Sequence, residues 1–354
     1  MKIGFNAYFL KGLRAGIGRY SWNVLEGLRK IALNDRFSIC DNPLGLNKFL
    51  FEQVYLPFKL WQDRPAVFFS PSMILPFWGK TPSVMVVYDL VFDLFPQYYR
   101  GLINQLYLKL FFAPSLLRAK KIIAISESTK MDLVNIYQVP PEKVRVIHLA
   151  AAEEYKIITD QARLSAIKRK YSLPDNYLLF VGTVEPRKNV RGLLQAYFSL
   201  PLSIRERHRL VICGQKGWGY KVLQAWLQDQ PARDEVVFLN YVDEADLPAI
   251  YNQAALFVYP SFYEGFGLPV LEAMACGVPT ITSKTSSIPE VAGDAAILID
   301  PNDPAQLAEK ISQVLADNAL AEELRANGLK QASKFSWQKT AQETMKLIKE
   351  LEKK

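Results

Sequence analysis

The chain has 354 residues, of which 50% are hydrophobic and 22% charged, and its formal net charge is +8. This composition is typical of a globular protein, and the length predicts two domains. Three cysteines without a paired pattern exclude a disulfide-rich secreted scaffold, and no uncharged apolar run approaches the roughly 20 residues that span a bilayer.

The positive charge belongs to the N-terminal part of the chain. Residues 1–155 hold 19 Lys and Arg against 12 Asp and Glu, and the remainder holds 24 against 23. Such an excess could face nucleic acid, an anionic membrane or an anionic substrate, or it could serve solubility alone. Residues 1–6 indicate a strand rather than a secretory signal, so we expect a cytoplasmic protein.

The N-terminal part alternates short apolar runs with helical stretches. Strands are predicted at 2–8, 37–40, 66–70, 84–88, 121–125 and 144–148. This alternation favours an α/β fold, in which a parallel sheet is covered by helices. A glycine-rich loop at 11–19 precedes a predicted helix at 20–33. Its Gly16-x-Gly18 lacks the third glycine of a dinucleotide fingerprint, so a plain turn is an alternative to ligand approach.

Tyr88 and Asp89 come at the end of the predicted strand 84–88. Ligands bind at this edge of open α/β sheets. Asp89 could orient an acceptor hydroxyl or cap a helix. Tyr88 can donate a hydrogen bond, but it cannot become a cation near neutral pH.

Residues 92–121 combine aromatic residues with five cations. We expect residues 102–112 to form a core helix, and the alternative is an interfacial helix that docks on anionic lipid. Because proline disrupts helix interiors, Pro114 predicts that this segment is not one long helix.

The second half of the chain repeats the alternation after a polar stretch at 150–176, where we place the domain linker. Strands are predicted at 177–181, 210–214, 236–239, 256–259, 278–282 and 295–299, and the final stretch, 335–351, indicates a helix. After the first of these strands, residues 182–189 read GTVEPRKN. Arg187 and Lys188 in this loop could neutralise a diphosphate, or they could be solvated loop charges.

Residues 256–282 read LFVYPSFYEGFGLPVLEAMACGVPTIT, which indicates a strand, a turn-rich loop, a helix and a second strand. Glycines in the loop let backbone N–H groups approach a phosphate, and a helix N-terminus favours one. Glu264 in the loop and Glu272 in the helix would then accept hydrogen bonds from hydroxyls, as on a nucleotide-sugar. The alternative is a plain strand–turn–helix corner with solvated glutamates. As a loop carboxylate, Glu264 is expected to contribute little to the core.

Metal ligands are scarce in the sequence. The only two histidines, His148 and His208, have no ligand-spaced partners, and no Asp-x-Asp occurs. We therefore predict that no metal and no other cofactor is required.

The nine residues EGFGLPVLE, followed by AMACGVPTI, resemble the signature of the family-4 retaining glycosyltransferases of GT-B fold. The resemblance implies two Rossmann-like, doubly wound domains that face each other across a cleft. Residues 1–155 would bind the acceptor, residues 156–335 would bind the donor, and a helix in 336–354 would cross back to the first domain. The activity implied is retaining, metal-independent sugar transfer from a nucleoside-diphosphate sugar to a glycan or lipid-linked acceptor. Mannose from GDP-mannose is the first candidate.

The same resemblance implies roles for single residues. It implies Glu264, Arg187 and Lys188 as catalytic residues, and Asp89 and Tyr88 on the acceptor side, although many relatives carry histidine in place of Tyr88. The donor-binding residues would be Gly16, Gly182, Arg187, Lys188, Val242, Asp243, Glu264, Gly265, Phe266, Gly267, Leu268 and Glu272.

The expected partners are the nucleotide-sugar donor and the acceptor, with no nucleic acid. We also expect a peripheral contact with an anionic membrane at the inner face of the cell membrane. Two other interpretations of the function remain open. One is another GT-B enzyme, either a phosphorylase or a nucleotide-sugar epimerase, and the other is a non-catalytic nucleotide-sugar-binding protein.

Overall fold

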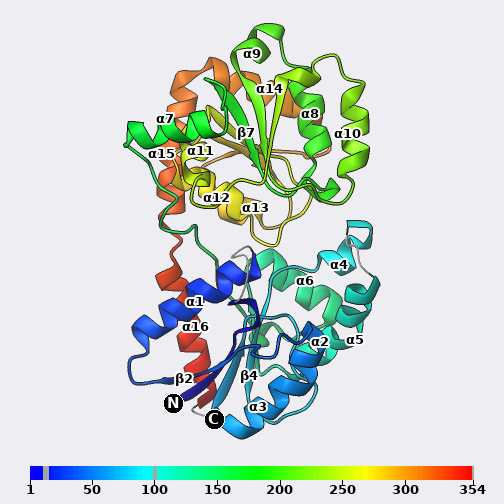
Figure 1. The fold of residues 1–354 in the computed structure, drawn as a ribbon, viewed down its shortest axis with the longest axis vertical. Helices are drawn as coiled ribbons and strands as arrows, with labels where there is room; N and C mark the ends of the chain where they lie inside the picture. The colour runs from blue at the N-terminus through cyan, green and yellow to red at the C-terminus, as the bar shows by residue number, and fades with distance from the viewer. Residues whose placement is uncertain (11–15, 99–101, 353–354) are drawn as a thin grey trace. The chain divides into compact units, whose positions relative to one another are not determined.

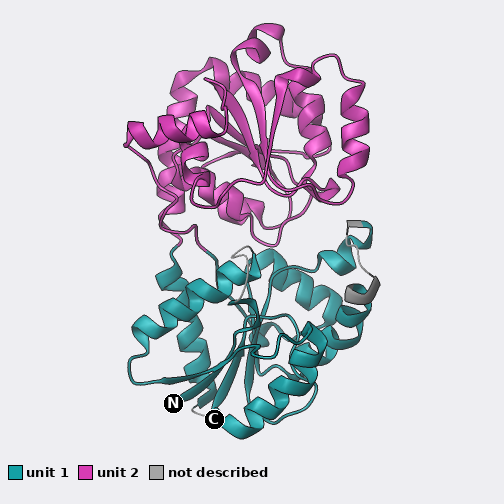
Figure 2. Cartoon of the chain, in the orientation of Figure 1, with its two compact units in different colours: residues 1–149, 336–354 teal, residues 150–335 magenta. Residues whose placement is uncertain are grey.

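The computed structural model describes residues 1–10, 16–98 and 102–352 and divides into two compact units (Figure 2). Unit 1 comprises residues 1–149 and 336–354, and unit 2 comprises residues 150–335. The division therefore falls after Leu149, whereas the sequence placed it after residue 155. The final stretch groups with unit 1.

The described part of unit 1 contains a six-stranded sheet in the order β2-β1-β3-β4-β5-β6, with every neighbouring pair parallel. Its strands are β1 (Lys2–Asn6), β2 (Arg36–Cys40), β3 (Val67–Ser70), β4 (Ser83–Val87), β5 (Lys121–Ala124) and β6 (Val144–Val146). The chain runs from β1 to β2 on one side and then to β3 on the other. This reversal of direction beside β1 makes the sheet doubly wound.

Helices cover both sides of this sheet. In Figure 1, α1 and α16 lie on one side, and α2, α3 and α5 lie on the other. The helical segments are η1 (Tyr8–Leu10), α1 (Ile17–Ile31), α2 (Lys48–Leu50), the π-helical turn η2 (Phe51–Tyr55), α3 (Leu56–Asp63), α4 (Val91–Leu94), η3 (Pro96–Tyr98), α5 (Leu102–Arg118), α6 (Glu127–Tyr137), η4 (Pro141–Lys143) and α16 (Trp337–Glu352). Helix α16 packs directly on α1, because a Cβ atom at Gly27 would lie 2.6 Å from that of Ala341.

The prediction that Pro114 prevents one long helix is wrong. Helix α5 is continuous from Leu102 to Arg118, with Pro114 inside it. Phe112 and Leu116 are buried on either side of the proline, so packing holds the helix together across it. The carbonyl that Pro114 cannot bond belongs to Leu110, whose side chain is exposed, so water can reach that position.

Unit 2 repeats the architecture. Its described residues contain a six-stranded sheet in the order β12-β11-β10-β7-β8-β9, again parallel throughout. The strands are β7 (Tyr177–Val181), β8 (Arg209–Cys213), β9 (Val236–Asn240), β10 (Leu256–Tyr259), β11 (Thr280–Ser283) and β12 (Ile297–Ile299). Here the reversal lies beside β7, because β8 pairs on one side of it and β10 on the other.

The helical segments of unit 2 precede, separate and follow these strands. They are α7 (Gln161–Lys170), η5 (Pro186–Lys188), α8 (Val190–Phe198), α9 (Leu202–Arg207), α10 (Tyr220–Gln228), η6 (Arg233–Glu235), α11 (Leu247–Asn252), α12 (Leu268–Ala275), α13 (Ile288–Ala292), α14 (Pro304–Ala316) and α15 (Asn318–Ala332). In the described part of the chain, no helix combines the length and the apolar composition needed to cross a membrane.

Candidate active site

The site in unit 2 begins where β7 and β10 end. The two strands pair in parallel, with Leu256 opposite Leu178, so the loops that follow them start at the same edge of the sheet. The first loop leads through Gly182 to Arg187 and Lys188, and the second leads to Glu264. The parallel pairing is what brings residues more than seventy positions apart in the sequence to one place.

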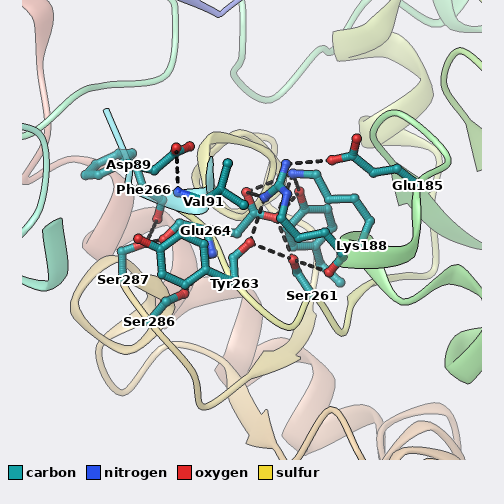
Figure 3. Close-up of polar contacts among 12 residues, drawn as sticks. Asp89, Val91, Glu185, Lys188, Ser261, Tyr263, Glu264, Phe266, Ser286 and Ser287 are labelled. Carbon is teal, nitrogen blue, oxygen red and sulfur yellow. Dashed lines mark hydrogen bonds and ion pairs between the residues drawn. The ribbon is translucent and has the colours of Figure 1, made fainter. Parts of the chain in front are cut away.

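Glu264 lies between the two cations of the first loop. Its carboxylate oxygens are 2.6 and 2.8 Å from the Lys188 Nζ atom, and the Arg187 guanidinium donates to it over 3.1 Å. Figure 3 shows this carboxylate among Lys188, Ser261 and Tyr263. Glu264 is only 6% exposed, so the expectation that it contributes little to the core is wrong.

Hydroxyl groups complete the surroundings of Glu264. Ser261 Oγ donates to it over 2.6 Å. The Tyr259 hydroxyl, from the end of β10, lies 2.9 Å from the carboxylate and 2.6 Å from Lys188 Nζ, so it links the anion to the cation. Burial by itself would raise the pKa of the Glu264 carboxyl. The charges of Lys188 and Arg187 outweigh burial and lower that pKa to about 2.

Arg187 has two hydrogen-bond partners besides Glu264. Its guanidinium donates to the Tyr263 carbonyl over 2.6 Å and to the Glu185 carboxylate over 2.7 Å. Glu185 bonds the Nη2 atom of Arg187 and Glu264 bonds the Nη1 atom, so two carboxylates balance two cations in this cluster. An incoming anion has to compete with these carboxylates for Arg187 and Lys188.

The loop around Glu264 is fixed by two serines that precede α13. Glu264 N donates to Ser286 Oγ over 2.8 Å, and Ser287 Oγ contacts the carbonyls of Glu264 and Phe266 at 2.8 and 2.9 Å. These bonds satisfy the backbone of a loop that carries no regular structure and hold the carboxylate in one position.

Helix α12 starts directly after this loop. Gly267 has a φ of 104°, and a Cβ atom there would lie 2.7 Å from Ile288, so this position requires glycine. The helix N-terminus that follows, at Leu268, carries backbone N–H groups suited to a phosphate.

Three other predicted donor residues of unit 2, Glu272, Val242 and Asp243, belong to other segments of the unit. Glu272 is buried in α12, where the Tyr251 hydroxyl donates to it over 3.2 Å. Val242 is buried, and Asp243 pairs with Lys170 of α7 at 3.0 Å. The structure shows where these residues lie, and their donor contacts stay predictions.

Gly182 and Gly214 bring two strand ends together. A Cβ atom at Gly214, which follows β8, would lie 1.9 Å from the Gly182 carbonyl oxygen. The two backbones can approach this closely only without a side chain at Gly214.

Three predicted residues belong to unit 1. Gly16 has a φ of 52° and immediately precedes α1. The Tyr88 hydroxyl donates to the Pro71 carbonyl over 2.9 Å, so it already has an internal partner. Asp89 accepts from the Val91 amide over 3.2 Å, one residue before Leu90, the N-cap of α4, and its acceptor-side role stays a prediction.

Six residues that contact the cluster were not singled out from the sequence: Glu185, Tyr259, Ser261, Tyr263, Ser286 and Ser287. The first four lie within a few residues of the predicted ones, at the same strand ends, and that placement is a signal that could have found them. Ser286 comes from a loop 22 residues beyond Glu264, and no local pattern connects the two. Among the residues that the structure describes, no three His, Cys, Asp or Glu side chains gather as ligands for a metal ion.

Comparison with known families gives two matches, one in each unit. Residues 165–331 match the family model "Glycosyl transferases group 1", and residues 45–151 match "Glycosyltransferase Family 4". Together the two matches cover more than half of the chain.

Two similar curated proteins come from Escherichia coli. The chain is 41% identical to O-antigen chain mannosyltransferase B over 236 residues, which cover 66% of this chain and 62% of that protein. It is 37% identical to serotype-specific mannosyltransferase WbdA over 233 residues, which cover 63% of this chain and 28% of that protein. The match thus spans less than two thirds of either relative.

A solved structure extends the likeness to the fold of the whole chain. Anabaena Alr3699/HepE, crystallised in complex with UDP and glucose, has a TM-score of 0.75 at 18% identity, covering 99% of this chain and 100% of that one. The expected fold, GT-B with two Rossmann-like α/β domains, is confirmed. With one family model matching in each of its two units, the chain belongs to the group 1 and family 4 glycosyltransferases.

Proposed function

We propose that the chain is a retaining, metal-independent glycosyltransferase that moves a sugar from a nucleoside-diphosphate sugar to a glycan or lipid-linked acceptor. Mannose from GDP-mannose is the first candidate, since both E. coli relatives are named as mannosyltransferases. The observation that carries the proposal is the cluster in which Arg187 and Lys188 meet Glu264 at the carboxyl edge of the unit 2 sheet.

The two cations suit the leaving group. When the anomeric C–O bond breaks, the bonding electron pair stays on the diphosphate, and its negative charge grows in the transition state. Arg187 and Lys188 would stabilise that charge in a site shielded from water, where charge interactions are strong. Backbone N–H groups at the start of α12 would add to this stabilisation. The acceptor hydroxyl oxygen forms the new bond to the anomeric carbon and loses its proton.

Glu264 is suited to orient the sugar rather than to protonate it. With a pKa of about 2, its carboxyl is ionised at neutral pH and can only accept hydrogen bonds. A diphosphate that draws Lys188 and Arg187 toward itself would free carboxylate oxygens for the hydroxyls of the sugar. Glu272 would accept from the ribose hydroxyls. The chemical route by which the anomeric configuration is retained follows from none of these contacts.

The place of action is part of the proposal. We place the enzyme on the cytoplasmic side of the cell membrane, peripherally bound, with a lipid-linked or glycan acceptor. This placement is supported by the excess of positive charge in residues 1–155 and by the name of one E. coli relative, which refers to an O-antigen chain.

A panel of radiolabelled nucleotide-sugars tests the proposal. The purified chain, incubated with each donor and no acceptor, should release labelled sugar slowly from one donor, because glycosyltransferases can hydrolyse their donor with water. Lys188→Ala should slow this release roughly 10- to 100-fold, whereas Lys221→Ala, at an exposed position of α10, should not slow it. Binding of a donor without any release or transfer would favour the non-catalytic alternative, and release that depends on inorganic phosphate would favour a phosphorylase.

A further inference from the structure

Unit 1 has an apolar stripe on the outside of its helical segment 48–63. Phe51, Leu56 and Leu60 of this segment are buried and anchor it in the core. Its outer side is apolar as well: Val54, Phe58 and Trp61 are 60, 59 and 67% exposed, and Leu50 precedes them. The spacing of four, four and three residues places all four side chains along one face. A helix anchored by one apolar face normally presents polar residues on the other.

A second exposed stripe runs along α5. Leu106 and Leu110 are each 58% exposed and Leu117 is 83% exposed, at spacings of four and seven residues. The buried side of the same helix includes Leu108 and Phe112. Both stripes therefore belong to helices whose core contacts are already satisfied by other side chains.

Hydrogen bonds join the helices of the two stripes through the loop at 75–78. Gln53 accepts a hydrogen bond from the Phe77 amide at 2.8 Å and donates one to the Tyr107 hydroxyl of α5 at 3.2 Å. At the other end of α5, Arg118 donates to the Trp78 carbonyl over 3.2 Å. Phe77 and Trp78 are themselves 55 and 70% exposed. We call the exposed apolar side chains of 50–61, 77–78 and 106–117 the outer apolar face.

The segments that form this face are strongly basic. Residues 48–64, 76–80 and 102–121 contain eight Lys and Arg but only two carboxylates. Glu52 is fully buried and accepts hydrogen bonds from Ser72 and Tyr107, and Asp63 pairs with Lys59. Both negative charges are thus engaged inside the unit, so the surroundings of the face are positive.

We propose that the outer apolar face docks unit 1 onto the interface of a membrane that contains anionic lipid. Aromatic and aliphatic side chains would enter the headgroup region, where tryptophan is favoured, and the surrounding cations would attract anionic lipid. A second copy of the chain fits less well, because a two-fold contact would bring two basic surfaces together.

This surface differs from the one that the sequence suggested. Of the aromatic residues in 92–121, Phe92 and Phe112 are buried in the core and cannot reach a membrane. Phe58, Trp61, Phe77 and Trp78, which lie outside that stretch, take their place. The inference rests on the membrane placement proposed above and names its surface, but it is tested separately from sugar transfer, since membrane binding is measured without any donor.

Co-sedimentation with vesicles tests the inference. The full chain is mixed with phosphatidylcholine vesicles, with or without about one third phosphatidylglycerol, and pelleted at low and high salt. We expect binding that requires the anionic lipid and weakens with salt. Phe58→Glu/Trp61→Glu should lower the vesicle partition coefficient at least roughly tenfold, because two charges replace apolar contacts with the membrane. Both positions are largely exposed, so the fold should be retained.

The matched control is Leu33→Glu/Val222→Glu, which places two charges at exposed apolar positions outside the outer apolar face. We expect this variant to bind vesicles as the unaltered chain does. The inference is overturned if the unaltered chain does not pellet with anionic vesicles, or if both double variants bind alike. It is also overturned if the unaltered chain is a dimer by light scattering and Phe58→Glu/Trp61→Glu only converts that dimer to a monomer.

Discussion

Glu264 shows how one buried carboxylate can serve both stability and chemistry. It is the shared partner of Lys188 and Arg187, and it is also the group proposed to hold the sugar. In a buried cluster, removing one member leaves its partners uncompensated, so single substitutions here act on folding as well as on turnover. Experiments on these residues therefore have to measure the free energy of unfolding beside the rate.

We predict that Lys188→Ala and Arg187→Ala each weaken donor use. A charge-assisted hydrogen bond is worth about 1.5–3 kcal/mol, which corresponds to roughly a 10- to 100-fold loss in kcat/KM for the donor. Steady-state kinetics with the accepted nucleotide-sugar measure this loss in kcat/KM, and Lys221→Ala is the control. Since Arg187 also bonds the Tyr263 carbonyl, its variant should lose more stability than the Lys188 variant. Unchanged kinetics in both variants would contradict the assignment.

Glu264→Gln should lower the free energy of unfolding by about 3–5 kcal/mol at pH 7, because it leaves two cations without their carboxylate. This difference in the free energy of unfolding between wild type and variant should depend on pH. The folded pKa of about 2 lies below the ordinary value of 4.5, so the carboxylate stabilises the fold fully above pH 4.5. That stabilisation is lost as the pH falls toward 2.

Urea denaturation of both proteins between pH 7 and 2 measures this effect. The stability gap between wild type and Glu264→Gln should narrow below pH 4.5, while Glu309→Gln, at an exposed position in α14, should track the wild type throughout. If the difference in the free energy of unfolding stays constant down to pH 2, the ionised Glu264 carboxylate is not the group that stabilises the fold.

At the scale of elements, the packing of α16 on α1 depends on one missing side chain. Gly27 faces Ala341, and the two helices are close enough that a second methyl group has no space. The final helix can therefore belong to unit 1 although more than 180 residues of unit 2 separate it from the rest of that unit.

We predict that Gly27→Ala destabilises unit 1. Alanine favours a helix over glycine by about 1 kcal/mol, but overpacking costs about 1–3 kcal/mol, and we expect the second effect to prevail. The double variant Gly27→Ala/Ala341→Gly moves the methyl group to the other helix and should recover part of the loss. The melting temperatures of the single and double variants show which of the two effects is larger. If Gly27→Ala raises the melting temperature, as helix propensity alone predicts, the contact is less tight than the distance indicates.

At the scale of the whole molecule, charge is distributed unevenly between the two parts of the chain, and ligands for metals are scarce. The described residues contain no grouping suited to a metal ion, and the diphosphate would be neutralised by Arg187 and Lys188 instead. Unit 2 would then bind the donor, and unit 1 would bind the acceptor.

We predict that sugar transfer proceeds at its full rate in EDTA. Transfer is measured with and without excess chelator, and then after Mg²⁺ or Mn²⁺ is restored. A loss of activity in EDTA that either metal reverses would refute metal independence. The Lys188→Ala variant provides an internal comparison, because added metal should not rescue it if the cation acts as proposed.

Local patterns in the sequence were enough to predict the fold class and the two loops that carry the candidate site. Apolar runs of strand length, separated by helical periods, are local signals, and they predicted both parallel sheets and each of the twelve described strands. The loops at 182–189 and 260–268 were also predicted from local chemistry, since glycine, proline and charged residues at strand ends need no knowledge of distant neighbours. The family resemblance rests on the same contiguous residues.

How those parts meet depends on contacts between residues that are distant in the sequence. The burial of Glu264 between Lys188 and Arg187 follows from the pairing of β7 with β10, and no pattern within either loop encodes it. Helix α5 continues through Pro114 because its buried face packs on the core, which outweighs the local preference of proline. Likewise, the aromatic residues of 92–121 looked suited to a membrane, yet the exposed ones come from other segments. In each case contacts between residues distant in sequence set the outcome, and these contacts form only when the chain is folded.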